Sequence, residues 1–350
     1  MTTNESQVHL MRPRRKPLLV VLLVALILVF VISMSIGPSQ IPPYQVLGLL
    51  YNLLLRSQES TEPAALILFQ IRLPRVLAGA IVGASLSTAG VAFQGIFRNS
   101  MADPYVIGVS AGAALGAALA IVLGTSLGIP GLSDIPFLAF LGALLTILVV
   151  YNVARVGSKV PVTTLLLSGI AFSIFLSAVV ALLEVFAGWE LHTLVFWLMG
   201  GFSYIQLNEL WTVAILVSVS IVIIYMYARD LNILQLGEEE ARHLGVETEK
   251  TKKILIVAGS LATASAVSIS GIIGFVGLII PHITRLLVGP DHRILIPASM
   301  LVGAIFIMLC DAFGRVVLAP IDLPVGIVTA LSGGPFFIYL LKKRKGAYEI

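Results

Sequence analysis

The stretch VLAGAIVGASLSTAGVAFQGIF, residues 76–97, decides the fold class, because its 22 residues include no charged side chain. A helix needs about 20 mostly apolar residues to cross the hydrocarbon core of a bilayer. Arg75 and Arg98 close the stretch at its two ends. Its many glycine, alanine and serine residues would let neighbouring helices approach closely. We therefore predict a membrane-spanning helix packed inside a helical bundle.

The rest of the chain has the same character. Of its 350 residues, 58% are hydrophobic and 11% are charged, and the mean hydropathy is +1.02. A soluble domain is about a quarter charged, and disordered segments are poor in apolar residues, so both classes are excluded. The apolar runs are too long for barrel strands. We predict an all-α integral membrane protein with ten spans: Leu18–Ile36, Val76–Phe97, Tyr105–Gly128, Ile135–Ala154, Val162–Leu183, Leu210–Ala228, Ile254–Ser270, Ile272–Val288, Ile294–Val317 and Pro324–Leu341.

The placement of lysine and arginine gives the orientation, since both accumulate at the cytoplasmic ends of spans. With the N-terminus inside, 18 of the 22 lysine and arginine residues are cytoplasmic, and those outside are Arg56, Arg72, Arg75 and Arg315. We therefore expect both termini in the cytoplasm. Arg14–Lys16 before an apolar run also fits a secretory signal peptide. That run of 19 residues is long for the apolar region of a signal peptide, so we expect an uncleaved first helix.

The start of the eighth span is the least defined boundary, because residues 254–284 include no Asp, Glu, Lys or Arg. A break and an irregular second span are favoured by Gly271, Gly274, Gly277 and Pro281. The stretches GASLSTAG (83–90) and GSLATASA (259–266) are alike and lie in spans of opposite direction. This similarity fits an inverted repeat, a layout of many transporters, and it also fits plain small-residue packing.

We predict one transmembrane domain over residues 1–350, with a cytoplasmic tail (1–17), an external loop (37–70) and a cytoplasmic loop (229–253). The cytoplasmic loop contains GEEEARHLGV (237–246), in which three glutamates precede an arginine and a histidine between two glycines. Acids first, bases behind them and a C-terminal glycine are the order that a short helix prefers. The pattern fits either a solvated surface helix or a docking helix for a cytoplasmic partner.

The sequence offers no site for catalysis or for a nucleotide. It contains no G-x-x-x-x-G-K-[ST] and no H-E-x-x-H, its five histidines are scattered, and Cys310 is its single cysteine. We expect no catalytic residue, no metal site and no cofactor on this chain. Its basic residues lack interleaved stacking aromatics, so they indicate topology and not a nucleic-acid surface.

Ionisable side chains near predicted outer span ends are Glu184, Asp311 and Arg315. Asp311 and Arg315 are four residues apart, the spacing of a pair on one helix face. An interfacial ion pair and a proton relay both fit this spacing. No acid is placed at mid-membrane, which weakens an ion-coupled secondary transporter, and a membrane-embedded enzyme would need a catalytic constellation that the sequence lacks.

Three stretches together resemble the FecCD family: IRLPRVLAGAIVGASLSTAGVAFQGIFRNSMADPYVIGVSAGAALGA (71–117), GFVGLIIPHITRLLVGPDHRILIPASMLVGA (274–304) and LPVGIVTALSGGPFFIYLL (323–341). Family members are permease subunits of binding-protein-dependent ABC importers for iron–siderophores, haem and vitamin B12, and the resemblance covers about residues 17–345. It implies a BtuC-like permease fold in the cell membrane (the inner membrane of a Gram-negative cell), with a homodimer around the path. It also implies two ATP-binding cassette subunits, which would hold ATP and Mg²⁺, and an extracytoplasmic substrate-binding protein.

The resemblance also implies roles for particular residues. The coupling contacts with the ATPase would be made by Glu238, Glu239, Ala241, Leu244 and Gly245. Docking of the binding protein would involve Arg72, Arg75 and Arg315, although interfacial arginines also snorkel to headgroups or hold a helix start. Independently of the resemblance, the fifth span carries Ser168, Ser173 and Ser177, which would either point into the path or serve helix packing. The segment 191–203, with Trp197, would form an outer half-helix.

The substrate implied by the resemblance is an iron–siderophore, because that class is the commonest in the family. Vitamin B12, haem and molybdate remain alternatives, since family members for all of them share these motifs. The binding protein carries most of the selectivity.

Overall fold

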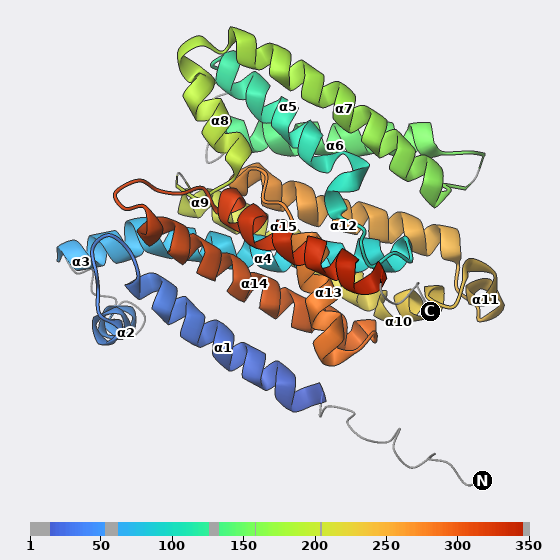
Figure 1. Cartoon of the computed structure of the whole chain (residues 1–350), viewed down its shortest axis with the longest axis horizontal. Helices are drawn as coiled ribbons and strands as arrows, with labels where there is room; N and C mark the ends of the chain where they lie inside the picture. Colours follow the sequence, from blue (N-terminus) through green and yellow to red (C-terminus); the bar gives the residue numbers. More distant parts are fainter. Residues whose placement is uncertain (1–14, 53–61, 126–132, 158, 204, 346–350) are drawn as a thin grey trace.

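The computed structural model describes residues 15–52, 62–125, 133–157, 159–203 and 205–345, and its regular structure there is helical apart from one isolated β-bridge between Val156 and Lys159 (Figure 1). Seven helices are long and apolar enough to cross a membrane, and three shorter apolar helices accompany them in the described part of the chain. These ten lie at the ten predicted spans.

The elements are α1 (Arg15–Ser35), α2 (Pro43–Tyr51), α3 (Pro63–Leu66), the π-helix η3 (Ile67–Arg72), α4 (Leu73–Ile96), the 3-10 helix η4 (Pro104–Ile107), α5 (Val109–Val122), α6 (Asp134–Ala154), α7 (Val162–Phe186), the 3-10 helix η5 (Gly188–Glu190), α8 (Leu191–Met199), α9 (Leu207–Met226), α10 (Ala228–Leu234), α11 (Glu238–His243), α12 (Thr248–Ser270), α13 (Val276–Val288), α14 (His292–Val317) and α15 (Val325–Lys345).

Helices α4 and α12 form the centre of the bundle. In the most apolar window of each, 78% of the residues are buried, against 22% in α7 and 11% in α1. Helices α5, α6 and α7 make a layer on one side, and α14 packs along α4 with α1 outside it (Figure 1). The start of α1, the end of α15 and the pair α10–α11 lie at one end of the molecule, opposite α2 and α3. The first and the last described helix therefore have these ends on the same side, which is consistent with the predicted placement of both termini on one side of the membrane.

Small residues hold the central helices close together, as the sequence predicts. A Cβ atom at Gly83 would collide with the carbonyl oxygen of Gly303 in α14, and one at Gly90 with that of Gly277 in α13. The two similar stretches also meet, because Ser85 Oγ in α4 donates a 2.8 Å hydrogen bond to the carbonyl of Ala262 in α12. Backbone contact of this kind replaces the missing hydrophobic drive between helices in lipid.

The predicted break after the seventh span is confirmed. Helix α12 ends at Ser270, Gly271 has φ +64°, and α13 begins only at Val276. Helix α13 is therefore shorter than predicted. The third span is interrupted in the same way, since Gly108 has φ +87° and separates η4 from α5. Glycine is the residue that adopts such backbone angles without steric cost.

The predicted external loop 37–70 needs a corrected boundary. It contains α2, and the helix of the second span begins at Pro63, running through α3 and η3 into α4. Pro63 occupies a first-turn position, where its missing N–H costs nothing. The π-helix before Pro74 accommodates a second proline that cannot donate to the preceding turn. Residues 53–61 lie outside the described part.

Candidate functional site

The cytoplasmic loop folds into α10 and α11, and the charge order predicts the second of these helices. The first turn of α11 holds three glutamates and its last turn holds Arg242 and His243. Gly245 ends the segment with φ +85°, and nothing lies within 4 Å of the position of its absent Cβ. The helix is short, has its acidic residues in the first turn and its basic residues in the last, and is bounded by glycine at both ends. The segment is therefore folded and not an irregular connection.

Two apolar side chains are exposed beside α11, in a segment that is otherwise charged. Leu236 is 61% exposed and Leu244 is 58% exposed. Glu239 is also exposed, whereas Glu238 is half-buried and its carboxylate lies 3.1 Å from Lys252 Nζ. Ala241 corrects one expectation: it is fully buried. It packs with Leu234 and Val246 in a small cluster that folds the segment, so its side chain is not at the surface.

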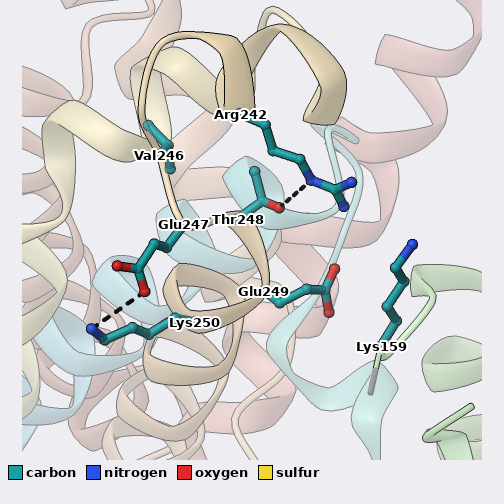
Figure 2. A pocket seen from close by; sticks show the side chains of 7 residues that line it. All are labelled: Lys159, Arg242, Val246, Glu247, Thr248, Glu249 and Lys250. Carbon is teal, nitrogen blue, oxygen red and sulfur yellow. Dashed lines mark hydrogen bonds and ion pairs between the residues drawn. The ribbon is translucent and has the colours of Figure 1, made fainter. Parts of the chain in front are cut away.

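A shallow, open surface pocket of about 390 Å³ lies beside this segment (Figure 2). Its lining residues are Lys159, Arg242, Val246, Glu247, Thr248, Glu249 and Lys250. Arg242 Nε donates to Thr248 Oγ1 at 3.1 Å, which orients the guanidinium over the pocket. Glu249 accepts a 3.3 Å bond from the backbone N–H of Val160, joining the start of α12 to the α6–α7 connection. The segment that follows α11 thus lies beside the α6–α7 connection.

At the opposite end of the molecule, five ionisable side chains form a cluster: Arg72, Arg75, Asp311, Arg315 and Asp322. Arg75 Nε donates to Asp311 Oδ1 at 2.6 Å, and its guanidinium also pairs with Asp322. Arg315 Nε lies 3.1 Å from Asp311 Oδ2, which confirms the pair four residues apart. The Asp311 side chain is fully buried within the protein. The cluster ties α4 to α14 and to the α14–α15 connection.

The two other arginines of this cluster cap the end of α1. Arg72 Nη1 donates to the carbonyls of Met34 and Ser35 at 2.7 and 2.9 Å. Arg315 donates to those of Ser33 and Ile36 at 2.8 and 2.9 Å. The last carbonyls of a helix lack partners within it, and a cation there is favourable for the helix dipole. Two buried guanidinium groups therefore anchor a helix of which only 11% of the most apolar window is buried.

The docking prediction rests on these same arginines. Arg72, Arg75 and Arg315 are 3%, 8% and 5% exposed, and this chain supplies partners to all three. Such placement favours the anchoring role over display to a second protein. Docking through them stays a prediction. Asp322 is the more exposed partner of Arg75, since 41% of its side chain is accessible to solvent.

The three serines of the fifth span have different surroundings. Ser177 is exposed, while Ser168 and Ser173 are half-buried. Ser173 Oγ donates to the carbonyl of Gly169 in its own helix at 2.8 Å, a bond that any helical serine can make. The half-helix expected at 191–203 is α8, which ends at Met199, and Trp189 before it is fully exposed.

Catalytic and metal constellations do not assemble in the described residues. No group of three or more His, Cys, Asp or Glu side chains there is placed to hold a metal ion. The stretch GVSAG (108–112) has the spacing of a nucleophile turn, but a 3-10 helix precedes it and not a strand. Ser110 therefore lacks the strand–turn–helix context in which such a serine becomes a nucleophile.

Two structurally important residues were missed in the sequence: Asp322 and Asn232. Asp322 stands in a connection, where an acid is usually solvated, and only the fold brings it to Arg75. Asn232 lies in the cytoplasmic loop and bonds to the start of α14. The sequence offers one weak signal for Asp322, which is its position three residues before Val325 at the start of α15. An acid just before a helix is common in loops, so this position does not single out Asp322.

Comparison with known proteins places these features in a family. The model of the FecCD transport family matches residues 25–343. The cobalamin import system permease protein BtuC of Halobacterium salinarum is 45% identical over 284 residues, covering 81% of this chain and 75% of the relative. The hemin transport system permease protein HmuU of Yersinia pestis is 38% identical, covering 80% and 84%. A solved structure described as an inward-facing metal-chelate type ABC transporter superposes with TM-score 0.80 at 35% identity, covering 94% of this chain and 99% of that one.

Proposed function

The chain belongs to the FecCD transport family, and from this membership we propose that its cargo is a metal held in an organic ligand, with a corrinoid as the first candidate. It is a multi-pass permease subunit of an ABC importer in the cell membrane and not an enzyme, so ATP is hydrolysed on separate subunits. An extracytoplasmic binding protein delivers the cargo.

The observation that carries the transport mechanism is the exposed surface formed by α11 and the residues that flank it. Leu236 and Leu244, directly before and after the helix, remain uncovered in a charged segment, and we infer that a partner protein covers them. Ala241 and the Lys252–Glu238 pair hold that face rigidly to the bundle. A chain without a phosphate-binding loop needs such a surface to receive motion from an ATPase. We assign this contact to Leu236, Leu244 and Glu239.

The choice of cargo departs from the expectation of an iron–siderophore. The relative with 45% identity is a cobalamin permease, the one with 38% a hemin permease, and the superposed structure a metal-chelate transporter. What these cargoes have in common is a metal enclosed by an organic ligand. The higher identity of the cobalamin permease supports a corrinoid before haem.

The test is uptake by proteoliposomes that contain this chain, its ATPase and its binding protein. We expect ATP-dependent uptake of cyanocobalamin to exceed that of hemin, a ferric hydroxamate and molybdate. An ATPase that binds but does not hydrolyse ATP is the control. Uptake of another of these compounds would replace the corrinoid, and uptake that needs an ion gradient but no ATP would overturn the importer mechanism.

We further propose that two copies of the chain assemble around the path through α7. Only 22% of its most apolar window is buried, and its uncovered side includes Ser177 and Thr163 beside large apolar residues. A hydroxyl group on a side that faces only lipid can bond only within its own helix, whereas one that lines a passage can also meet water or cargo. A second copy related by a two-fold axis would cover this side and enclose a passage.

A further inference from the structure

Helix α10 connects the coupling segment to three different helices through three polar side chains. Asp230 Oδ2 accepts a 3.5 Å bond from Thr251 Oγ1 at the start of α12. Asn232 bonds to the first residues of α14. Gln235 Nε2 donates to the carbonyl of Gly95 at the end of α4, at 3.1 Å. We call these three contacts the joints of α10. Since α11 follows α10 directly, a displacement of α11 is either transmitted through these joints to α12, α14 and α4 or absorbed at them.

The joint at Asn232 is the most completely bonded of the three. Its Oδ1 accepts from the backbone N–H of His292 at 2.9 Å and from His292 Nδ1 at 2.7 Å. Its Nδ2 donates to Asp291 Oδ1 at 2.8 Å. The backbone N–H can meet only an oxygen, so it fixes the orientation of the amide and places a proton on His292 Nδ1. Asp291 also caps α14 by accepting from the backbone N–H of Arg293 at 3.1 Å.

The residues around this joint are tightly packed. His292 is 2% exposed and Leu231 is fully buried. A Cβ atom at Gly95 would lie 2.7 Å from Leu231 Cδ2 and 3.1 Å from His292 Nε2. Three helices therefore meet at one point, where α10, α4 and α14 cannot slide past each other without breaking contact.

Helices α4 and α14 then extend from this point to the outer end as a closely packed pair. Gly83 and Gly303 bring their backbones into contact midway, and the Arg75–Asp311 bond of 2.6 Å joins them near the outer surface. A pair fixed in the middle and at the far end moves as one body. Movement of the start of α14 would therefore reach the outer end.

We propose that Asn232 is a positioning residue for transport: its amide passes the displacement of α10–α11 to α14. The proposal rests on the function proposed above, in which an ATPase moves α11. Without this amide, α11 would still bind the ATPase through its exposed face, but its motion would be absorbed between α10 and α14. Hydrolysis would then continue with less cargo moved per ATP.

A reciprocal exchange tests this joint in the assembled complex with ATPase and binding protein, reconstituted in proteoliposomes. Asn232→Asp places two carboxylates in contact with each other and should lower cargo moved per ATP hydrolysed by roughly two- to thirtyfold, the range found for single positions in coupling networks. Adding Asp291→Asn restores this hydrogen bond with its direction reversed, because the new amide at position 291 can donate to the new carboxylate at position 232. That carboxylate also remains an acceptor for His292. The double variant should recover most of the ratio. Asn152→Ala is the matched control, because that exposed amide bonds only to the carbonyl of Leu148 in its own helix.

A second readout separates transmission from folding. A spin label at His243→Cys, an exposed position of α11 that is not among the residues assigned to the ATPase contact, reports α11. One at Phe313→Cys, a 56% exposed position, reports the outer part of α14. Nucleotide should move both labels in the wild-type background and only the first in Asn232→Asp. An unchanged transport ratio in Asn232→Asp, or loss of complex assembly that the double variant fails to recover, overturns the proposal. If the wild-type complex itself transports nothing with ATP, the function proposed above fails instead.

Discussion

At the scale of single residues, the buried arginines show how charge is accommodated in a chain that is mostly apolar. Removing a charge from water costs several kcal/mol unless partners replace the solvent. Arg75 is held by two carboxylates, while Arg72 and Arg315 bind the carbonyls at the end of α1. Each cation therefore has a structural use that needs no second protein.

Charge reversal at Arg72 distinguishes anchoring from docking. Arg72→Glu would set a carboxylate against the carbonyl oxygens of Met34 and Ser35, and we expect the free energy of unfolding to fall by roughly 2–5 kcal/mol. The measurement is unfolding of the purified protein, with the exposed Arg155→Glu as control. The anchoring role would be contradicted by a variant of normal stability that binds the binding protein slowly at low salt and normally at high salt, since a docking charge behaves in that way.

Asp103 gives a pH dependence in the connection between α4 and η4. Burial raises the pKa of its carboxyl from 3.8 to about 6, although the backbone N–H of Tyr105 donates to it. A carboxyl whose pKa is higher in the folded chain favours folding at low pH, and this contribution is lost as the pH rises from about 4 to about 6. Asp103→Asn keeps the acceptor for Tyr105 and cannot ionise. Wild-type melting temperature should therefore fall relative to the variant between pH 4 and 6, and parallel curves would refute the assignment.

At the scale of elements, the short helices carry the specific roles and the long spans form the frame. Helix α11 is too short to be stable alone, and its position depends on Ala241 inside and on Gly245 at its end. Helices α5 and α13 are likewise shortened by glycines that interrupt their spans. Each interruption lies where the backbone must turn toward another element.

Gly245 tests how far α11 depends on its end. Gly245→Val should cost about 1–2 kcal/mol, because a β-branched residue is strained at φ +85° while the surrounding space is open. We expect membrane insertion and binding-protein association to persist and transport per ATP to fall. Gly245→Asn, which tolerates this backbone region, is the control and should transport normally. Equal activity of both variants would make this segment a plain connection.

At the scale of the whole molecule, burial falls from the centre of the bundle to its edges. Helices α4 and α12 are enclosed, whereas α7 and α1 are largely uncovered on one side. Lipid covers α1, whose exposed residues are apolar. The hydroxyl-bearing side of α7 is the one we assign to a second copy.

Cross-linking tests that assembly. With Cys310 replaced by alanine, Ser177→Cys should form a covalent dimer in membranes with a short bifunctional thiol reagent. Val219→Cys, a 48% exposed position on α9, is the control and should remain monomeric. Dimers at both positions, or at neither, would show that α7 does not line the two-fold axis.

The amino-acid sequence by itself determined the class of fold, the positions of ten apolar helices, the orientation and the family. These properties follow from the length of apolar runs, the side of the membrane on which lysine and arginine accumulate, and local glycine and proline signals, all of which are read along the chain. The short helix ended by Gly245 was predictable for the same reason. The tertiary structure alone decided that Ala241 points inward, that Asp322 reaches Arg75, and that Asn232 joins α10 to α14. Those contacts link residues far apart in the chain or depend on which face of a short helix is covered, and only the packing of helices sets them.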